Sequence, residues 1–126
     1  MTRMAISEPG RYYHDRRSIV LREGLRLDEE RAVLWHELVH ARRGDADCAG
    51  WFRSAQERSV EREAAQRAMP LAAMEHWLSE TTDWPEFVWH MKVPEPWVRF
   101  RVTVAHPAER ALLERACRWG RAESTA

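Results

Sequence analysis

The pattern of hydrophobic and polar positions predicts short strands at the start of the chain and helices after them. Residues 11–14 and 18–21 are rich in aromatic and β-branched residues, and turns are indicated at Asp15 and Gly24. We therefore predict a short antiparallel sheet within residues 11–27. The first ten residues lack such a pattern and are expected to be loosely structured.

A well-bounded helix is predicted over residues 28–43. Asp28 is a candidate N-cap, two glutamates follow in the first turn, two arginines occupy the last turn, and Gly44 ends the helix. The middle of this helix is apolar nearly all round. Such a pattern is typical of a buried helix.

Helical spacing returns in residues 54–79. The apolar stripe of this stretch consists of Val60, Ala64, Ala68 and Leu71. Pro70 predicts a kink or a break in the helix, because proline lacks the backbone N–H that a helix interior needs. The preceding residues 44–50 have the composition of a loop.

Residues 83–118 are expected to form short helices. Asp83 and Glu86 have the spacing of an N-terminal capping box, and Pro96 and Pro107 each suit a first helical turn.

Two stretches near the C-terminus are less regular. Hydrophobic residues alternate in 97–104, as in a strand, but the position of this stretch between two helix starts favours a helix. Residues 121–126 are expected to fray.

Length and composition limit the class of protein. The 126 residues have the size of one domain, and 44% hydrophobic with 32% charged residues is typical of a globular chain. Together with the element pattern, this predicts an α+β fold that is mostly α-helical. No apolar run approaches the roughly 20 residues of a membrane span, and no secretory signal is recognised, so a cytoplasmic protein is expected.

Charge and cysteine content add two expectations. Twenty basic and twenty acidic residues cancel, which argues against a protein built mainly to bind nucleic acid. Cys48 and Cys117 are expected to be free thiols in a reducing compartment.

The most informative motif is the HExxH sequence from His36 to His40. Residues four apart lie on the same helix face, so both imidazoles can reach one metal ion. Zinc suits two imidazoles and one carboxylate, with a fourth position left for water. Glu37 is then placed to take a proton from that water and to pass it to a leaving amine.

A solvated helix face with two incidental histidines is the alternative interpretation of this motif. The motif lies at the centre of a helix with apolar flanks, and a buried histidine pair needs polar partners. A metal site is therefore the favoured interpretation.

A third ligand is required, and several downstream residues could supply it. Glu61 is favoured because it shares a helix face with small alanines that permit close approach to the first helix. Glu57 lies one turn earlier and could support the ligands. Glu63 is rotated by about 200° from Glu61 and is expected to form an exposed ion pair with Arg67. The other candidates are Asp45, Asp47, Cys48 and His76.

Two segments together resemble the ImmA/IrrE metallopeptidases, in particular the short forms of actinobacteria and their phages and mobile elements. The matching residues are 30–40 and 57–67, and the second segment is similar to the family's E-x-x-A-N-x-F-A signature. The resemblance implies a small zincin-like domain in which Glu37 is the catalytic residue. The zinc ligands that it implies are His36, His40 and Glu61.

The chain departs from the family pattern at three positions. Ala65 replaces the usual asparagine, Arg67 replaces the usual aromatic residue, and Pro70 comes earlier than the family's proline. Many family members also carry a helix-turn-helix domain, for which this length leaves no separate room.

The resemblance implies a zinc-dependent endopeptidase with a regulatory role. Its expected partner is a protein substrate, a cognate helix-turn-helix repressor or anti-factor, and neither a membrane nor a directly bound nucleic acid is expected. One alternative is a non-catalytic, zinc-stabilised module that binds a transcriptional regulator. Another is a DNA-binding protein that uses residues 83–118.

Overall fold

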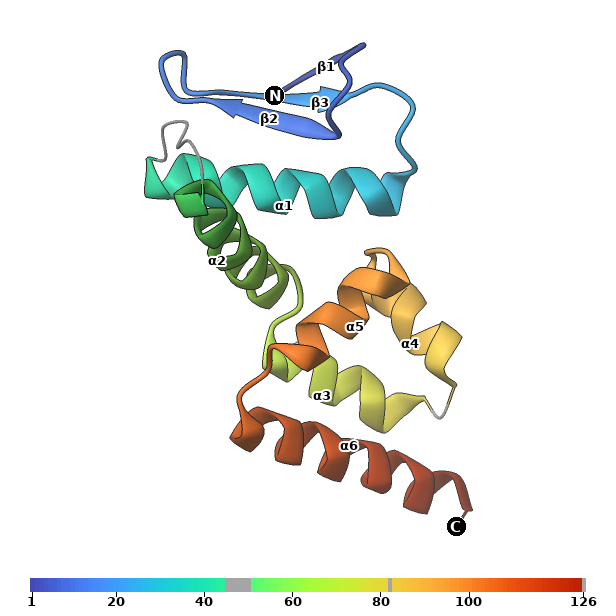
Figure 1. Cartoon of the computed structure of the whole chain (residues 1–126). Helices are drawn as coiled ribbons and strands as arrows, with labels where there is room; N and C mark the ends of the chain where they lie inside the picture. Colours follow the sequence, from blue (N-terminus) through green and yellow to red (C-terminus); the bar gives the residue numbers. More distant parts are fainter. Residues whose placement is uncertain (45–50, 82, 126) are drawn as a thin grey trace. The chain divides into compact units, whose positions relative to one another are not determined.

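The computed structural model describes residues 1–44, 51–81 and 83–125, without the side chains of 51–53 and 118–125. The chain divides into two compact units, Met1–Arg67 and Ala68–Ala126. Unit 1 contains a small sheet and two helices, and unit 2 is helical (Figure 1). The α+β, mostly helical class expected from the sequence is confirmed at this level, while a single domain over residues 1–126 stays a prediction.

Three strands form the sheet of unit 1: β1 (Thr2–Met4), β2 (Gly10–Tyr13) and β3 (Ser18–Arg22). Their order is β1-β3-β2, so the apolar β3 lies in the centre. β2 and β3 form the predicted antiparallel hairpin, with Tyr13 opposite Ser18 and Gly10 opposite Leu21. Arg17 adopts a positive φ of 46° in the connecting turn.

The sheet is mixed, which corrects the expectation of a purely antiparallel one. β1 pairs in parallel with β3, from Thr2 opposite Val20 to Met4 opposite Arg22. Residues 1–10 were expected to be loosely structured, which is wrong for β1. This strand is short, exposed and without alternating hydrophobicity, so its sequence gives no strand pattern. Backbone pairing to a central strand and a two-bond ion pair from Arg3 to Glu30 hold it in place.

Helix α1 (Leu27–Arg43) packs against β2 and β3, and it carries the HExxH motif. Its N-cap is Arg26, not the predicted Asp28. The Glu29 carboxylate accepts a hydrogen bond from the Arg26 backbone N–H, and the Asp28 carboxylate accepts one from the Glu29 N–H. Acidic side chains inside the first turn thus satisfy the free amides. Gly44 ends the helix at a φ of 69°, as predicted.

The expectation that α1 is buried on all sides is wrong. Glu37, Val39 and His40 are buried, whereas Leu38 is 41% exposed and Leu27 is 84% exposed. One face of α1 covers the sheet, and a three-stranded sheet is too small to enclose the helix. Hydrophobic residues on the other faces remain accessible to solvent.

Helix α2 (Trp51–Ala68) ends before Pro70, and α3 (Leu71–Glu80) begins directly after it. The break predicted at Pro70 is therefore confirmed. Val60 and Ala64 of the predicted apolar stripe are fully buried. The predicted loop at residues 44–50 lies, apart from Gly44, outside the described residues.

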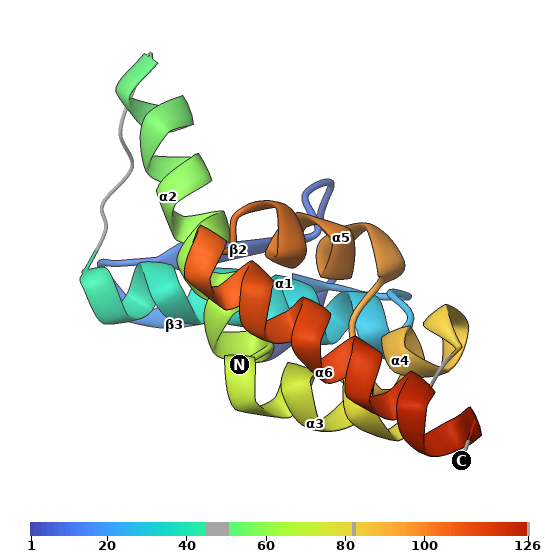
Figure 2. The ribbon, with the colours of Figure 1, turned by 90° about the horizontal axis from the view of Figure 1, so that it is seen from below.

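Unit 2 consists of α3, α4 (Trp84–Met91), α5 (Glu95–Thr103) and α6 (Pro107–Thr125), and α3 and α6 lie side by side (Figures 1 and 2). The helix favoured for residues 97–104 is confirmed, with Val104 as its C-cap. Helix α6 continues through Thr125, so the expected fraying is wrong for residues 121–125, while Ala126 lies outside the described residues. Alanine, arginine and glutamate favour helix, which explains the extension.

Asp83 occupies the N-cap of α4, but the predicted capping box does not form. Glu86 instead accepts a hydrogen bond from the Thr81 hydroxyl at 3.0 Å, and the same hydroxyl accepts one from the Asp83 backbone N–H at 3.1 Å. The Thr81 hydroxyl therefore accepts the hydrogen bond from the Asp83 N–H that the Glu86 carboxylate was expected to accept.

The core of unit 2 contains a buried arginine among methionine and aromatic side chains. Arg101 is 2% exposed, and its Nε donates to the Met69 carbonyl at 2.9 Å. Its Nη2 lies 3.7 Å from the Glu109 carboxylate. Nearby, the rings of Trp77 and His90 stack at 3.6 Å between centroids. Hydrogen bonding and ring stacking thus fix helices that are individually short.

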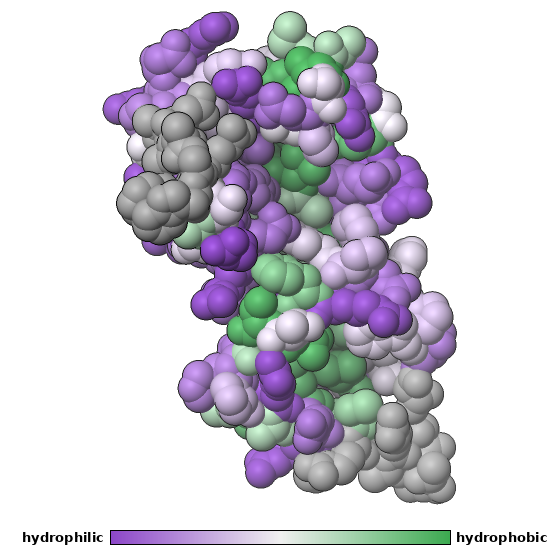
Figure 3. All heavy atoms as spheres, viewed as in Figure 1, coloured by the Kyte–Doolittle hydropathy of each residue, from purple (hydrophilic) through white to green (hydrophobic). Residues whose placement is uncertain are grey.

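Figure 3 shows hydrophobic residues gathered in the middle of the visible face of unit 2, while the visible face of unit 1 is mostly hydrophilic. Among the described residues, no helix combines the length and the apolar composition needed to cross a membrane.

Gly10 is a point of close packing between the sheet and α1. A Cβ atom at this position would lie 2.5 Å from Cγ1 of Val33 and 3.4 Å from Cγ of Glu37. Val33 is β-branched and has few alternative rotamers in a helix, so it cannot readily move aside. Glycine therefore lets β2 approach α1 beside the motif glutamate.

We expect Gly10→Ala to lower the free energy of unfolding by about 1–3 kcal/mol, as overpacking of a close contact does. Urea denaturation measures the change. In a Val33→Ala background, which removes the clashing methyl, the same substitution should cost clearly less. An equal cost in both backgrounds would contradict the packing explanation.

Candidate metal centre

Helix α1 presents the two motif histidines one above the other. His36 and His40 are one helical turn apart, and their ring centroids are 5.0 Å apart. Both rings are largely shielded from solvent, with side-chain exposures of 18% and 11%. The spacing in the sequence predicted this pairing.

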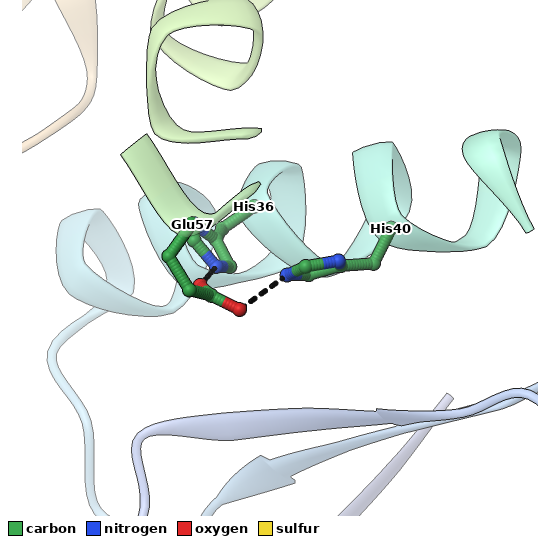
Figure 4. Close-up of side chains that lie close together, drawn as sticks. All are labelled: His36, His40 and Glu57. Atoms are coloured by element: carbon green, nitrogen blue, oxygen red, sulfur yellow. Dashed lines mark hydrogen bonds and ion pairs between the residues drawn. The ribbon is translucent and has the colours of Figure 1, made fainter. Parts of the chain in front are cut away.

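The carboxylate of Glu57 lies between the two imidazoles (Figure 4). Its Oε2 is 2.8 Å from Nε2 of His36, and its Oε1 is 3.0 Å from Nε2 of His40. Nitrogen and oxygen atoms of these three residues lie within 4.8 Å of one another, which makes them a group that could hold a metal ion. Two segments separated in the sequence thus converge on one small volume.

Glu61 approaches the other side of the His36 ring. Its Oε2 lies 2.7 Å from Nδ1 of His36, so the two nitrogens of this imidazole face two different carboxylates. Glu57 and Glu61 are both on α2, one turn apart and on the same face. Two carboxylates on one face of α2 can therefore approach the same ring from its two sides.

The structure brings the expected ligands His36 and His40 together, and it places Glu61 against His36. His36 and His40 converge, and Glu37 lies on the same helix. Glu57, expected to support the ligands, reaches both Nε2 atoms, while Glu61, expected as the ligand, contacts Nδ1 of His36. The face argument favoured Glu61, but Glu57 shares that face one turn earlier, and its carboxylate is the one that reaches both Nε2 atoms.

The other candidates for the third ligand do not join the His36–His40–Glu57 group in the part of the chain that the structure describes. Glu63 forms the predicted ion pair with Arg67 at 3.1 Å. His76 lies in unit 2, where its ring contacts Trp77. Asp45, Asp47 and Cys48 lie outside the described residues.

An arginine of α1 anchors α2 beside the cluster. Arg43 donates to the Ser59 hydroxyl at 3.1 Å and to the Glu63 carboxylate at 3.0 Å. Its second contact to Ser59, at the backbone carbonyl, is 3.3 Å long. The sequence indicated the pair with Arg67 but not this link between helices, because the partners are 16 and 20 residues apart.

The cluster perturbs the acid–base properties of the motif. Burial of the His36 ring acts to lower its pKa, but the hydrogen bond and charge of Glu61, with the charges of Glu37 and Glu57, outweigh burial and raise the pKa. Burial also raises the pKa of the Glu37 carboxyl, against the opposing charges of the two imidazoles. The surroundings thus stabilise a proton on either group.

The donor set fits a divalent transition-metal ion. Two imidazole nitrogens and one carboxylate are a common set of protein ligands for such ions, and imidazole suits zinc, copper, iron and nickel alike. Among the described residues, these three side chains are the group that meets the spacing. The donors therefore support a metal site without selecting the ion.

Comparisons with protein-family models, with curated proteins and with solved structures give no match to this chain.

Proposed function

We propose that the protein is a zinc-dependent peptidase with a regulatory role and a zincin-like arrangement of its active-site helix. The observation that carries this proposal is the convergence of His36, His40 and Glu57 beside the buried motif residue Glu37. The HExxH spacing and the similarity of residues 30–40 and 57–67 to ImmA/IrrE metallopeptidases support the same assignment.

Zinc is the proposed ion because two histidines and one carboxylate are its ligands in many hydrolytic sites. His36, His40 and Glu57 would hold it. When bound, zinc acts as a Lewis acid toward a carbonyl oxygen and increases the acidity of water. The carboxylate of Glu57 is 41% exposed, so the cluster can be reached from solvent.

Glu37 is the proposed proton carrier. Its side chain is buried, and burial raises its carboxyl pKa, which favours uptake of a proton from water at the carboxylate. The same carboxyl group can then deliver that proton to the nitrogen of the departing amine. The contact of β2 with α1 at Gly10 limits where the Glu37 side chain can lie.

The proposed substrate is a regulatory protein, and the resemblance favours a helix-turn-helix repressor or an anti-factor. The second candidate function is a non-catalytic module in which the same metal centre stabilises a surface that binds such a regulator. The two differ in their need for Glu37, because a binding module requires the ligands but no proton carrier.

We expect Glu37→Gln to retain zinc and to lose peptide cleavage. The amide is similar in shape to the carboxylate, but it cannot accept the proton. The zinc-loaded protein is incubated with a proteome-derived peptide library, and mass spectrometry identifies new N-termini. Glu30→Gln is the matched control, since Glu30 lies on the same helix but pairs with Arg3.

Cleavage by wild type and by Glu30→Gln, without cleavage by Glu37→Gln, would support the peptidase. Equal cleavage by Glu37→Gln would remove Glu37 from the mechanism. If wild type and Glu37→Gln both bind zinc and a regulator but neither cuts, the binding module is the correct function.

Metal binding is tested independently of any substrate. We expect about one zinc ion per chain and a weakening of more than about 100-fold in Glu57→Ala, beyond the usual cost of losing a residue that only supports a ligand. His36→Ala and His40→Ala should behave in the same way. Isothermal titration with a competing chelator measures the affinities.

Zinc should also stabilise the fold, because it binds groups assembled only in the folded state. At 100 times its Kd, the ion raises the free energy of unfolding by about 2.7 kcal/mol. Thermal unfolding with and without a chelator measures this effect. A metal-free protein that takes up no zinc and melts at an unchanged temperature would contradict the metal site.

A further inference from the structure

Each nitrogen of the His36 imidazole faces a carboxylate. Glu57 lies 2.8 Å from its Nε2, and Glu61 lies 2.7 Å from its Nδ1. A neutral imidazole carries its proton on one nitrogen and a lone pair on the other, so a carboxylate that accepts a hydrogen bond from one nitrogen directs the lone pair to the opposite side. The two contacts therefore assign different tasks to the two glutamates.

The convergence of Nε2 atoms identifies the side that faces a metal. His40 also presents its Nε2 to Glu57, at 3.0 Å. The two histidines thus offer the same ring nitrogen to the same carboxylate, and Glu57 belongs to the metal-facing side. Glu61 contacts His36 through the nitrogen that points away from this meeting point.

We propose that Glu61 is a positioning residue for His36: it accepts a hydrogen bond from Nδ1–H, fixes the ring and keeps the Nε2 lone pair directed at the metal position beside Glu57. This inference rests on the proposed metal centre, and it assigns Glu61 a role other than the ligand role implied by the family resemblance. A carboxylate that orients a ligating histidine also increases the electron density at the ligating nitrogen.

The placement of Glu61 is fixed by contacts on both sides of its position along α2. Arg43 of α1 holds Ser59, two residues earlier, and Glu63, two residues later. The Glu61 side chain thus projects from a segment that two hydrogen-bonded contacts tie to α1. Because the backbone of Glu61 is already ordered, its carboxylate can orient the ring with a smaller loss of conformational entropy.

The test compares zinc affinity in Glu61→Ala, Glu61→Gln and Glu57→Ala with that of wild type. We expect Glu61→Ala to bind zinc about 10–100-fold more weakly, as loss of a supporting carboxylate does, and Glu57→Ala to lose more. Glu61→Gln should recover most of the affinity, because its amide oxygen can still accept a hydrogen bond from Nδ1–H. Glu114→Gln is the control: it makes the same chemical change at an exposed glutamate of α6 in unit 2 and should bind zinc as wild type does.

Cobalt substitution separates positioning from ligation. The visible absorption of bound Co²⁺ reports its ligands, so the spectrum of Glu61→Ala should match that of wild type, and the spectrum of Glu57→Ala should differ. Melting temperatures of the metal-free variants check that each is folded.

Two results would overturn the positioning role of Glu61 while leaving the metal centre intact. The first is wild-type zinc affinity in Glu61→Ala. The second is a changed cobalt spectrum and a larger loss of affinity in Glu61→Ala than in Glu57→Ala, which would make Glu61 the ligand. Failure of the wild-type protein to bind zinc or cobalt would instead overturn the proposed function, and this inference with it.

Discussion

The candidate site depends on one arrangement, the carboxylate of Glu57 placed between the Nε2 atoms of His36 and His40. One helix can supply two imidazoles on one face, but the third donor must come from another segment whose position is fixed independently. Arg43 supplies that constraint, because it reaches from the end of α1 to Ser59 and Glu63 of α2. The geometry of the cluster therefore depends on contacts that take no part in the cluster itself.

Helix α1 needs its own support, because its apolar residues are only partly covered. The sheet supplies this support through the close approach at Gly10, where any side chain would overlap Val33. The small sheet thus acts as a platform that fixes the rotation of α1, and this rotation decides which way the motif residues face.

The sequence predicted the features that depend on local spacing. The strands around residues 11–21, the helix stop at Gly44, the break at Pro70 and the pair of motif histidines all follow from patterns within a few residues. It did not predict β1, whose pairing with β3 is held by backbone bonds that any sequence can make. Glu57 and Glu61 share one face of α2, so the spacing in the sequence could not show which carboxylate lies between the two Nε2 atoms. That depends on how far α2 is shifted along α1, and the choice of Glu61 as the metal ligand stays a prediction.

The balance of charge around the histidines is compatible with a bound cation. Three carboxylates, those of Glu37, Glu57 and Glu61, act on the His36 ring, and their combined effect raises its pKa despite burial. A partly buried group of acids is costly unless positive charge compensates it, and protons on the imidazoles or a bound cation can supply that charge. A divalent ion at the Nε2 side would supply the charge without a proton there. The Nδ1 proton would remain for Glu61, and the Glu37 carboxylate would be free to exchange protons with water.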